Sequence, residues 1–108
     1  TMSYEIPREI FKQKLLDRTN LCLIQVLDAN SNQEVPFKDV KTIHCPLNIE
    51  DFNKNFGQKT MTYIIYGFDQ FSSEAKKAAE ALTTNGYPFV YFYQGNLSQD
   101  KVLDKGIN

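Results

Sequence analysis

Few side chains in this sequence could act as a nucleophile or a base. Two cysteines, Cys22 and Cys45, and the only histidine, His44, are the first candidates. His44 and Cys45 are adjacent, which suggests a thiol beside a base, but consecutive side chains of a strand point to opposite faces of a sheet. We therefore expect Cys22 and Cys45 to be reduced structural thiols, with a nucleophilic Cys45 as the alternative.

Two serines, Ser72 and Ser73, precede an alanine-rich segment. Their hydroxyls could serve as nucleophiles, but no histidine lies near them in the sequence to act as the base. Serine is also common at the start of a helix, where its side chain caps free backbone N–H groups. We expect the capping role.

These serines lie at a junction between a predicted strand and a predicted helix. Met61 to Tyr66 is an apolar run typical of a buried strand, and Ser73 to Asn85 carries a stripe of alanines and ends at Gly86. The N-terminus of such a helix can bind an anion or a thiolate through its free N–H groups and its dipole. The residues in between are Gly67, Phe68, Asp69, Gln70, Phe71 and Ser72, and no cysteine follows Cys45.

The other predicted elements alternate between strands and helices. Leu21 to Leu27 predicts a strand buried on both faces, and Lys41 to Cys45 predicts a shorter one closed by Pro46. This alternation predicts an α/β fold with a parallel central sheet and helices on both faces, in a single domain over residues 1–108. The remaining expected elements are a helix that opens at Ile6 and breaks at Asn20, a loop over Asp28 to Lys38, a short helix carrying Ile49, Phe52 and Phe56, a strand over Pro88 to Tyr93, and a last helix from Ser98 to Gly106.

Composition excludes several classes of partner. The net charge of −1 gives no electrostatic attraction to nucleic acid or to an anionic membrane. No apolar run approaches the roughly 18 residues that span a bilayer, and the N-terminus does not resemble a signal peptide, so we expect a cytoplasmic protein. One histidine and two cysteines fall short of the ligand set of a structural zinc site, so we expect no metal and no cofactor.

The order of these elements resembles the rhodanese-like (sulfurtransferase) family from Ile6 to Ile107. This resemblance implies a loop cysteine, after the strand ending near Tyr66, that carries a sulfane sulfur as a persulfide with the help of basic residues. Four segments carry the likeness: the opening helix with Ile6, Phe11 and Leu15; Leu23-Ile24-Gln25-Val26-Leu27; Ile64-Ile65-Tyr66-Gly67 with Ala75 to Leu82 and Gly86-Tyr87; and Gly95 to Asp100.

The sequence departs from the family pattern where the chemistry would lie. The place of the loop cysteine reads Gly67, or Asp69 when Phe71 to Glu74 is aligned with a similar loop of the cell-cycle dual-specificity phosphatases, which share the fold. The nucleophile is missing in both alignments, and no arginine follows Arg18. Outside this loop, the residues that replace a family acid, arginine, glycine and tryptophan are Gln25, Leu27, Asn96 and Asp100.

We therefore expect a catalytically inactive rhodanese-like module that acts in protein interaction or regulation, with another protein or a second copy as partner. Its site would be the degenerate loop from Gly67 to Ser73, where Phe68 and Phe71 either pack beneath the loop or stay exposed as anchors for a partner. The alternative is a sulfurtransferase or phosphatase-like enzyme that uses Cys45 or a cysteine from a partner. We expect a Gly67→Cys variant to fold but to have little activity, since its thiol would lack basic neighbours.

Overall fold

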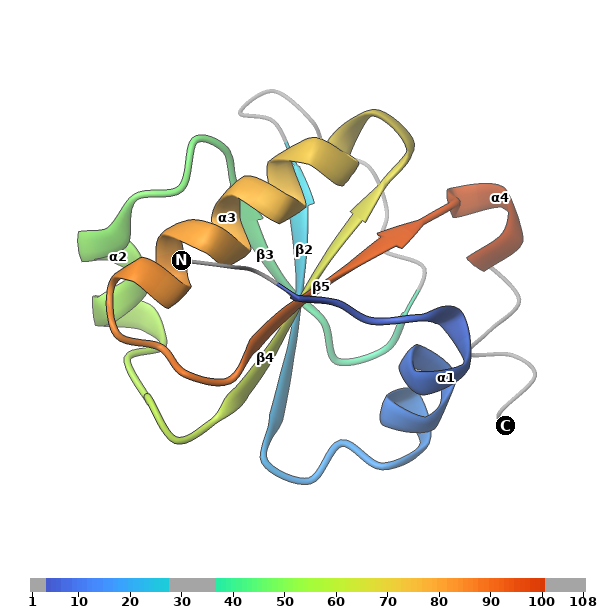
Figure 1. Ribbon diagram of the computed structural model, residues 1–108, viewed down its shortest axis with the longest axis horizontal. Helices are drawn as coiled ribbons and strands as arrows, with labels where there is room; N and C mark the ends of the chain where they lie inside the picture. Colours follow the sequence, from blue (N-terminus) through green and yellow to red (C-terminus); the bar gives the residue numbers. More distant parts are fainter. Residues whose placement is uncertain (1–3, 28–36, 101–108) are drawn as a thin grey trace.

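The computed structural model describes residues 4–27 and 37–100 of the chain (Figure 1). Its centre is a five-stranded parallel sheet with the strand order β1-β5-β4-β2-β3. The strands are β1 (Tyr4–Glu5), β2 (Leu21–Leu27), β3 (Lys41–His44), β4 (Thr62–Phe68) and β5 (Val90–Gly95). The helices are α1 (Arg8–Leu16), α2 (Ile49–Asn55), α3 (Ser72–Thr84) and α4 (Leu97–Asp100), with a 3₁₀ turn, η1, at Asp69–Phe71.

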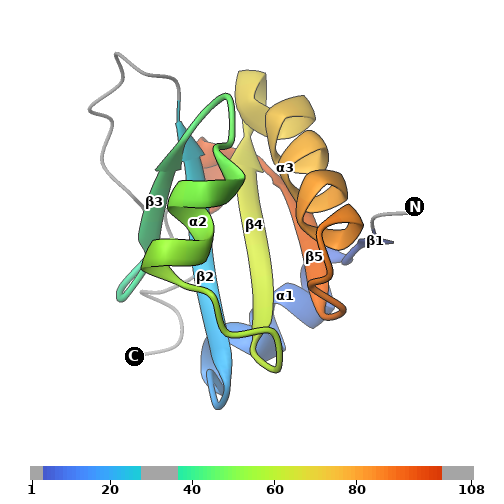
Figure 2. The same ribbon diagram turned by 90° about the vertical axis from the view of Figure 1, so that its left-hand side faces the viewer.

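Helices cover both faces of this sheet, which confirms the predicted α/β class. Figure 2 shows α2 and α3 in front of the strands and α1 behind them. The face under α2 and α3 is lined by alternate strand residues such as Ile24, Tyr63 and Phe92, and the face under α1 by their neighbours such as Leu23 and Ile64. Successive strand side chains point to opposite faces, so strands that are apolar at nearly every position supply both cores.

Strand β2 has the bounds that the sequence pattern predicts, whereas the elements near the ends of the chain differ from the prediction or lie outside the described residues. The strand Leu21–Leu27 has the predicted bounds, and Gly86 follows α3 with a φ of 95°, as expected for its role in ending the helix. Strand β1 was not predicted, because two residues carry no periodic pattern. Residues 28–36 of the expected loop and 101–106 of the expected last helix lie outside the described residues.

Aromatic rings fill the core under α1. The ring of Phe11, from α1, stacks on Tyr93 with centroids 4.1 Å apart, and Phe37 meets Tyr66 edge to face at 5.0 Å. Offset and edge-to-face ring pairs are favourable beyond the area that they bury. A nine-residue helix can therefore close this face of the sheet.

A polar side chain, that of Gln25, lies inside this apolar layer. Gln25 is fully buried on β2, between Thr42 of β3 and Tyr66 of β4 in the strand register. Neither atom of its side-chain amide has a hydrogen-bond partner in the part of the chain that the structure describes. An amide buried without partners costs free energy, so this position lowers the stability of the fold.

Replacing Gln25 with methionine should therefore stabilise the protein. Methionine has a similar length and no polar atom, and we expect the free energy of unfolding to rise by roughly 1–3 kcal/mol. Denaturant unfolding measures the change, with Gln13→Met on the exposed side of α1 as the control, expected to stay within about 0.5 kcal/mol. A loss of stability in Gln25→Met would show that the amide has a partner in the folded protein.

Candidate functional site

The junction between β4 and α3 is more ordered than the loop that the sequence predicts. Gly67 and Phe68 still belong to β4 and pair with Gln94 and Gly95 of β5. Asp69 then turns the chain with a φ of 50°, and η1 leads directly into α3. Strand and helix are therefore joined by a single 3₁₀ turn.

Neither serine caps the helix in the predicted way. Ser72 is the first residue of α3, and its hydroxyl donates to the Asp69 carbonyl at 3.1 Å. The N-cap position is Phe71, which has no side-chain hydrogen bond to offer. Ser73 is exposed and lies within α3. The expectation of a serine cap is therefore wrong. The backbone N–H of Ser72, the first helical residue, instead donates to the Asp69 carbonyl in η1.

Both loop phenylalanines lie in the core. Phe68 is 2% exposed and Phe71 5% exposed, and their rings meet at 5.4 Å and 69°. The sequence left two alternatives for these rings, packing beneath the loop or exposure to a partner. In the structure both rings are packed. The reason for placing a partner surface on these two rings is thereby removed, because an anchor must be accessible.

Gly67 has no space for a side chain. A β-carbon at this position would overlap the Phe71 carbonyl and the side chain of Ala75 on α3. The residue is also buried inside a paired strand. A cysteine here would meet backbone that has no room to move, so the expectation that Gly67→Cys folds normally needs correction.

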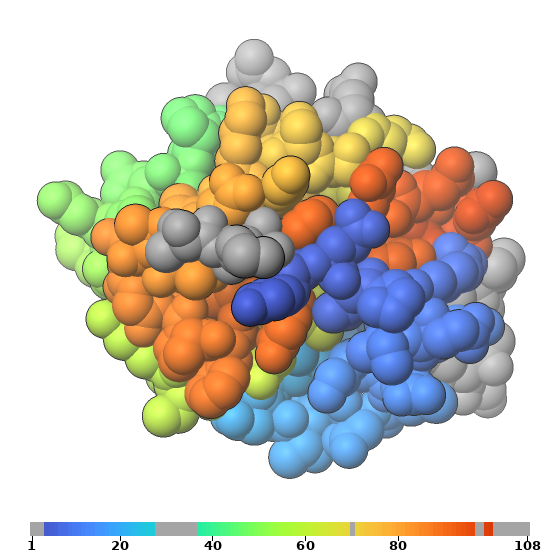
Figure 3. All heavy atoms as spheres, viewed as in Figure 1, coloured from blue at the N-terminus to red at the C-terminus, as the bar shows by residue number. Residues whose placement is uncertain are grey.

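Asp69, the other position aligned with the family cysteine, faces a polar groove. This groove of about 460 Å³ lies at the carboxyl ends of β1 and β5, and Asp69 shares it with Glu5, Arg8 and Gln94. Figure 3 shows the N-terminal segment (blue) lying beside the C-terminal segment (red). Arg8, the first residue of α1, lines the groove from this N-terminal segment. The structure describes the backbone of Gln70 but not its side chain.

Arg8 is already paired inside the protein. Its Nη1 lies 2.6 Å from Asp100 Oδ1 and donates to the Tyr93 hydroxyl at 3.2 Å. The groove is therefore lined by the carboxylates of Glu5 and Asp69 and by one guanidinium, which the buried Asp100 already pairs. This balance does not favour an anionic substrate.

Asp100 is the residue whose role the sequence did not reveal. It is fully buried and also accepts hydrogen bonds from the Tyr66 hydroxyl and the Asn96 N–H, each at 2.9 Å. Asn96 starts α4 by accepting from the Gln99 N–H at 3.2 Å, so Asn96, and not Ser98, lies at the helix start. No local pattern marks a buried acid whose partners lie 34 and 92 residues away.

The network around Asp100 changes the ionisation of its tyrosines. Burial raises the pKa of Tyr66 well above its ordinary value, and the nearby Asp100 charge raises it further. Burial and the same charge also raise the pKa of Tyr93. Both hydroxyls therefore stay protonated and act as donors, which suits a structural network better than acid–base chemistry.

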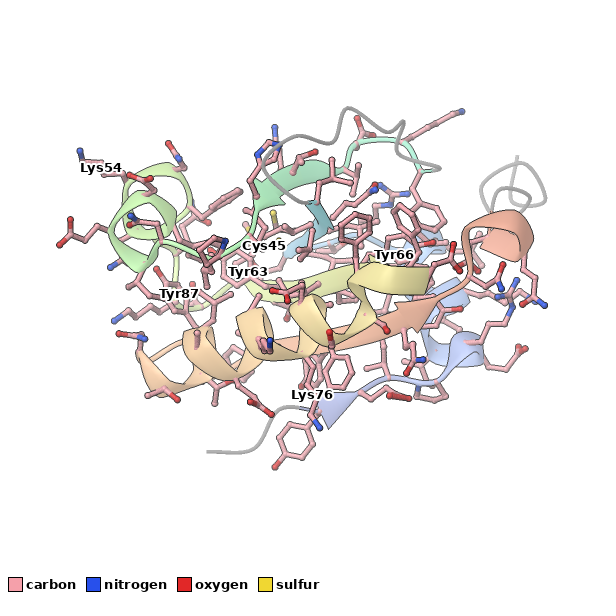
Figure 4. The ribbon with its side chains drawn as sticks, turned by 90° about the horizontal axis from the view of Figure 1, so that it is seen from above. Cys45, Lys54, Tyr63, Tyr66, Lys76 and Tyr87 are labelled. Carbon is pink, nitrogen blue, oxygen red and sulfur yellow. The ribbon has the colours of Figure 1, made fainter. Side chains whose placement is uncertain are left out.

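The two cysteines are separate from the junction. Cys45 lines an apolar cavity of about 180 Å³ with Val26, Glu74 and Ala78, and none of the residues 67–73 lines it. Cys45 directly follows β3 and packs on the α2 and α3 side of the sheet, whereas Tyr66 of β4 belongs to the core under α1 (Figure 4). Neither cysteine is in a disulfide, as expected, and burial raises the pKa of Cys22, which favours its unreactive form.

His44 does not activate Cys45. The strand register pairs His44 with Leu27 on the α1 face, whereas Cys45 packs against the core under α2 and α3. Within residues 4–27 and 37–100 there is no group of three or more histidine, cysteine, aspartate or glutamate side chains that could hold a metal ion. In the same ranges, no helix has the length and apolar character needed to cross a membrane.

Comparison with protein-family models, with curated proteins and with solved structures finds no match for this chain.

A side chain at Gly67 should unfold the junction. We expect Gly67→Cys and Gly67→Ala to lower the free energy of unfolding by roughly 3 kcal/mol or more, because the added atoms overlap backbone in a packed core. Gly57→Ala is the control, since Gly57 lies in an exposed loop with a φ of 67° and overlaps only the Asn53 carbonyl. A Gly67 variant that melts later than the Gly57 variant would contradict this packing.

Stability should fall in alkaline solution because of Tyr66. Below about pH 10 the Tyr66 phenol is protonated in both the folded and the unfolded protein. Its pKa is raised in the folded protein, so above this pH the phenol ionises in the unfolded chain first. The free energy of unfolding therefore falls as the pH rises. Tyr66→Phe should flatten this loss and cost about 1–2 kcal/mol at neutral pH through the lost hydrogen bond. Urea titrations at pH 8 to 11 test it, with the exposed Tyr4→Phe as control; an unchanged slope in Tyr66→Phe would assign the alkaline loss to other groups.

Proposed function

We propose that this protein is a catalytically inactive rhodanese-like module that acts in protein interaction or regulation. One observation carries the proposal: core packing occupies the place where the resembled family has its reactive loop. Phe68 and Phe71 are buried at the junction of β4 and α3, and Gly67 has no space for a thiol. A nucleophile would need both a reactive atom and open space in front of the helix N-terminus.

Electrostatics at this edge of the sheet support the same proposal. Transfer of sulfur or phosphoryl groups needs positive charge arranged around the reacting anion. The nearest arginine, Arg8, is held by the buried Asp100, and the exposed Asp69 adds negative charge to the groove. This groove would repel an anionic donor more than it would attract one.

The alternative, an enzyme that uses Cys45 or a cysteine from a partner, has less support. Cys45 lines an apolar cavity whose nearest charges, Glu74 and Lys77, lie 3.5 Å from each other and so offset one another. This lining differs from the basic surroundings in which reactive cysteines lie. Two cysteines outside any disulfide are in keeping with a reducing compartment, and we propose a cytoplasmic location.

Purified protein should therefore transfer no sulfur from thiosulfate or mercaptopyruvate to cyanide and should hydrolyse no aryl phosphate. Activity at the level of heat-denatured protein is the expected result, because the junction has no cysteine and Arg8 is already paired with Asp100. The matched variants are Cys45→Ser and Cys22→Ser. Turnover that Cys45→Ser abolishes and Cys22→Ser leaves intact would overturn the proposal and place the reaction at Cys45.

A further inference from the structure

The outer edge of β3 carries backbone groups that the sheet does not use. This strand ends the sheet order, and the N–H of Cys45, just after it, donates inward to the Leu27 carbonyl at 2.8 Å. Inward and outward residues alternate along a strand, so the N–H and C=O groups of Thr42 and His44 point outward. Both residues are exposed, and no strand of the described ranges pairs with this edge.

A groove with opposite charges at its two ends runs beside this edge. It has a volume of about 360 Å³ and lies between β3 and α2. Lys41 is the first residue of β3 and lies at one end of the groove. The chain enters α2 after the last residue of β3, so Asp51, in the first turn of α2, lies at the other end. Neither side chain forms an ion pair within the described protomer.

We propose that two copies of this chain pair antiparallel through β3, about a two-fold axis that passes beside Ile43. In this register Thr42 lies opposite the partner's His44, and His44 lies opposite the partner's Thr42. Each pair exchanges both of its N–H···O bonds, as facing residues of an antiparallel ladder do. The outward groups of both strands are then satisfied, and one sheet continues through both copies.

Antiparallel pairing also matches the charges of the groove. It turns the partner's β3 end for end, so the partner's Lys41 comes to the end of the groove where Asp51 lies. The two-fold axis repeats the contact, which gives two ion pairs from a single surface, as an isologous interface requires. An added parallel strand of the same sequence would instead place lysine beside lysine.

The half-buried Ile43 completes the contact. Its side chain is on the α2 side of the strand and meets the partner's Ile43 as a pair that shares no hydrogen bonds, with Cα atoms about 4.5 Å apart. Branched side chains facing each other in this way stabilise strand pairing. A four-residue edge buries little area, so we expect a dissociation constant in the micromolar range or weaker.

This inference goes beyond the proposed function and does not depend on it. The pairing edge lies on β3, away from the junction of β4 and α3, and an active enzyme could associate in the same way. Sedimentation reports on association alone, so its outcome is independent of the sulfur-transfer and phosphatase assays.

Sedimentation velocity over a range of protein concentrations tests the pairing. We expect the wild type to shift from monomer to dimer, and Lys41→Glu or Asp51→Lys to raise the dissociation constant about tenfold or more, since two like-charge contacts replace two attractive ones. Thr42→Pro should also abolish association while preserving the fold, because it removes a donor that points outward. Lys76→Glu, on α3 at the opposite edge of the sheet, is the control and should dimerise normally (Figure 4).

The sharpest test mixes the two charge variants. A Lys41→Glu copy pairs with an Asp51→Lys copy through two restored attractive contacts, so an equimolar mixture should form heterodimers although each variant alone is monomeric. Both substitutions are at exposed positions and leave the backbone intact, which thermal melting verifies, so this test stands even if Thr42→Pro fails to fold. A wild type that stays monomeric at every concentration, association that the single variants leave unchanged, or a mixture that stays monomeric would overturn the proposal.

Discussion

The buried carboxylate of Asp100 is the interaction on which the arrangement of this fold depends. It joins the start of α1 through Arg8, the middle of the sheet through Tyr66, and the start of α4 through the Asn96 N–H. A buried charge is tolerated only when several donors surround it, so these segments must come together for any of them to be stable there. Gly95 permits the contact, because a β-carbon would overlap both the Tyr66 ring and the carboxylate.

This network lies next to the junction of β4 and α3, where the sequence resemblance predicts a reactive loop. Its arginine and tyrosines are side chains that could serve catalysis, but here they stabilise the fold. An arginine that could have held an anionic substrate is held by Asp100, and the tyrosines beside it keep their protons. At the neighbouring junction, Phe68 and Phe71 are buried in the core under α1. The buried rings and the paired arginine at this edge of the sheet are the physical basis of the inactive module that we propose.

Much of the fold could be predicted from local pattern. The strand Leu21–Leu27 was placed with its exact bounds, because continuous apolar runs of this length are typical of strands buried on both faces. Local pattern failed at element ends: β4 continues through Gly67 and Phe68, since β5 lies beside it and supplies the hydrogen-bond partners. Pairing between distant segments decides where such a strand stops.

The candidate site could also be predicted only in part from the sequence. The amino-acid sequence alone shows that no cysteine follows Cys45 and that two phenylalanines and an acid lie at the junction. Tertiary contacts are needed to show that the two rings are buried, that Gly67 has no room for a side chain, and that Asp100 meets Arg8 across 92 residues. The reason is physical: composition and spacing fix local preferences, but burial and ion pairing depend on which distant segments the sheet brings together.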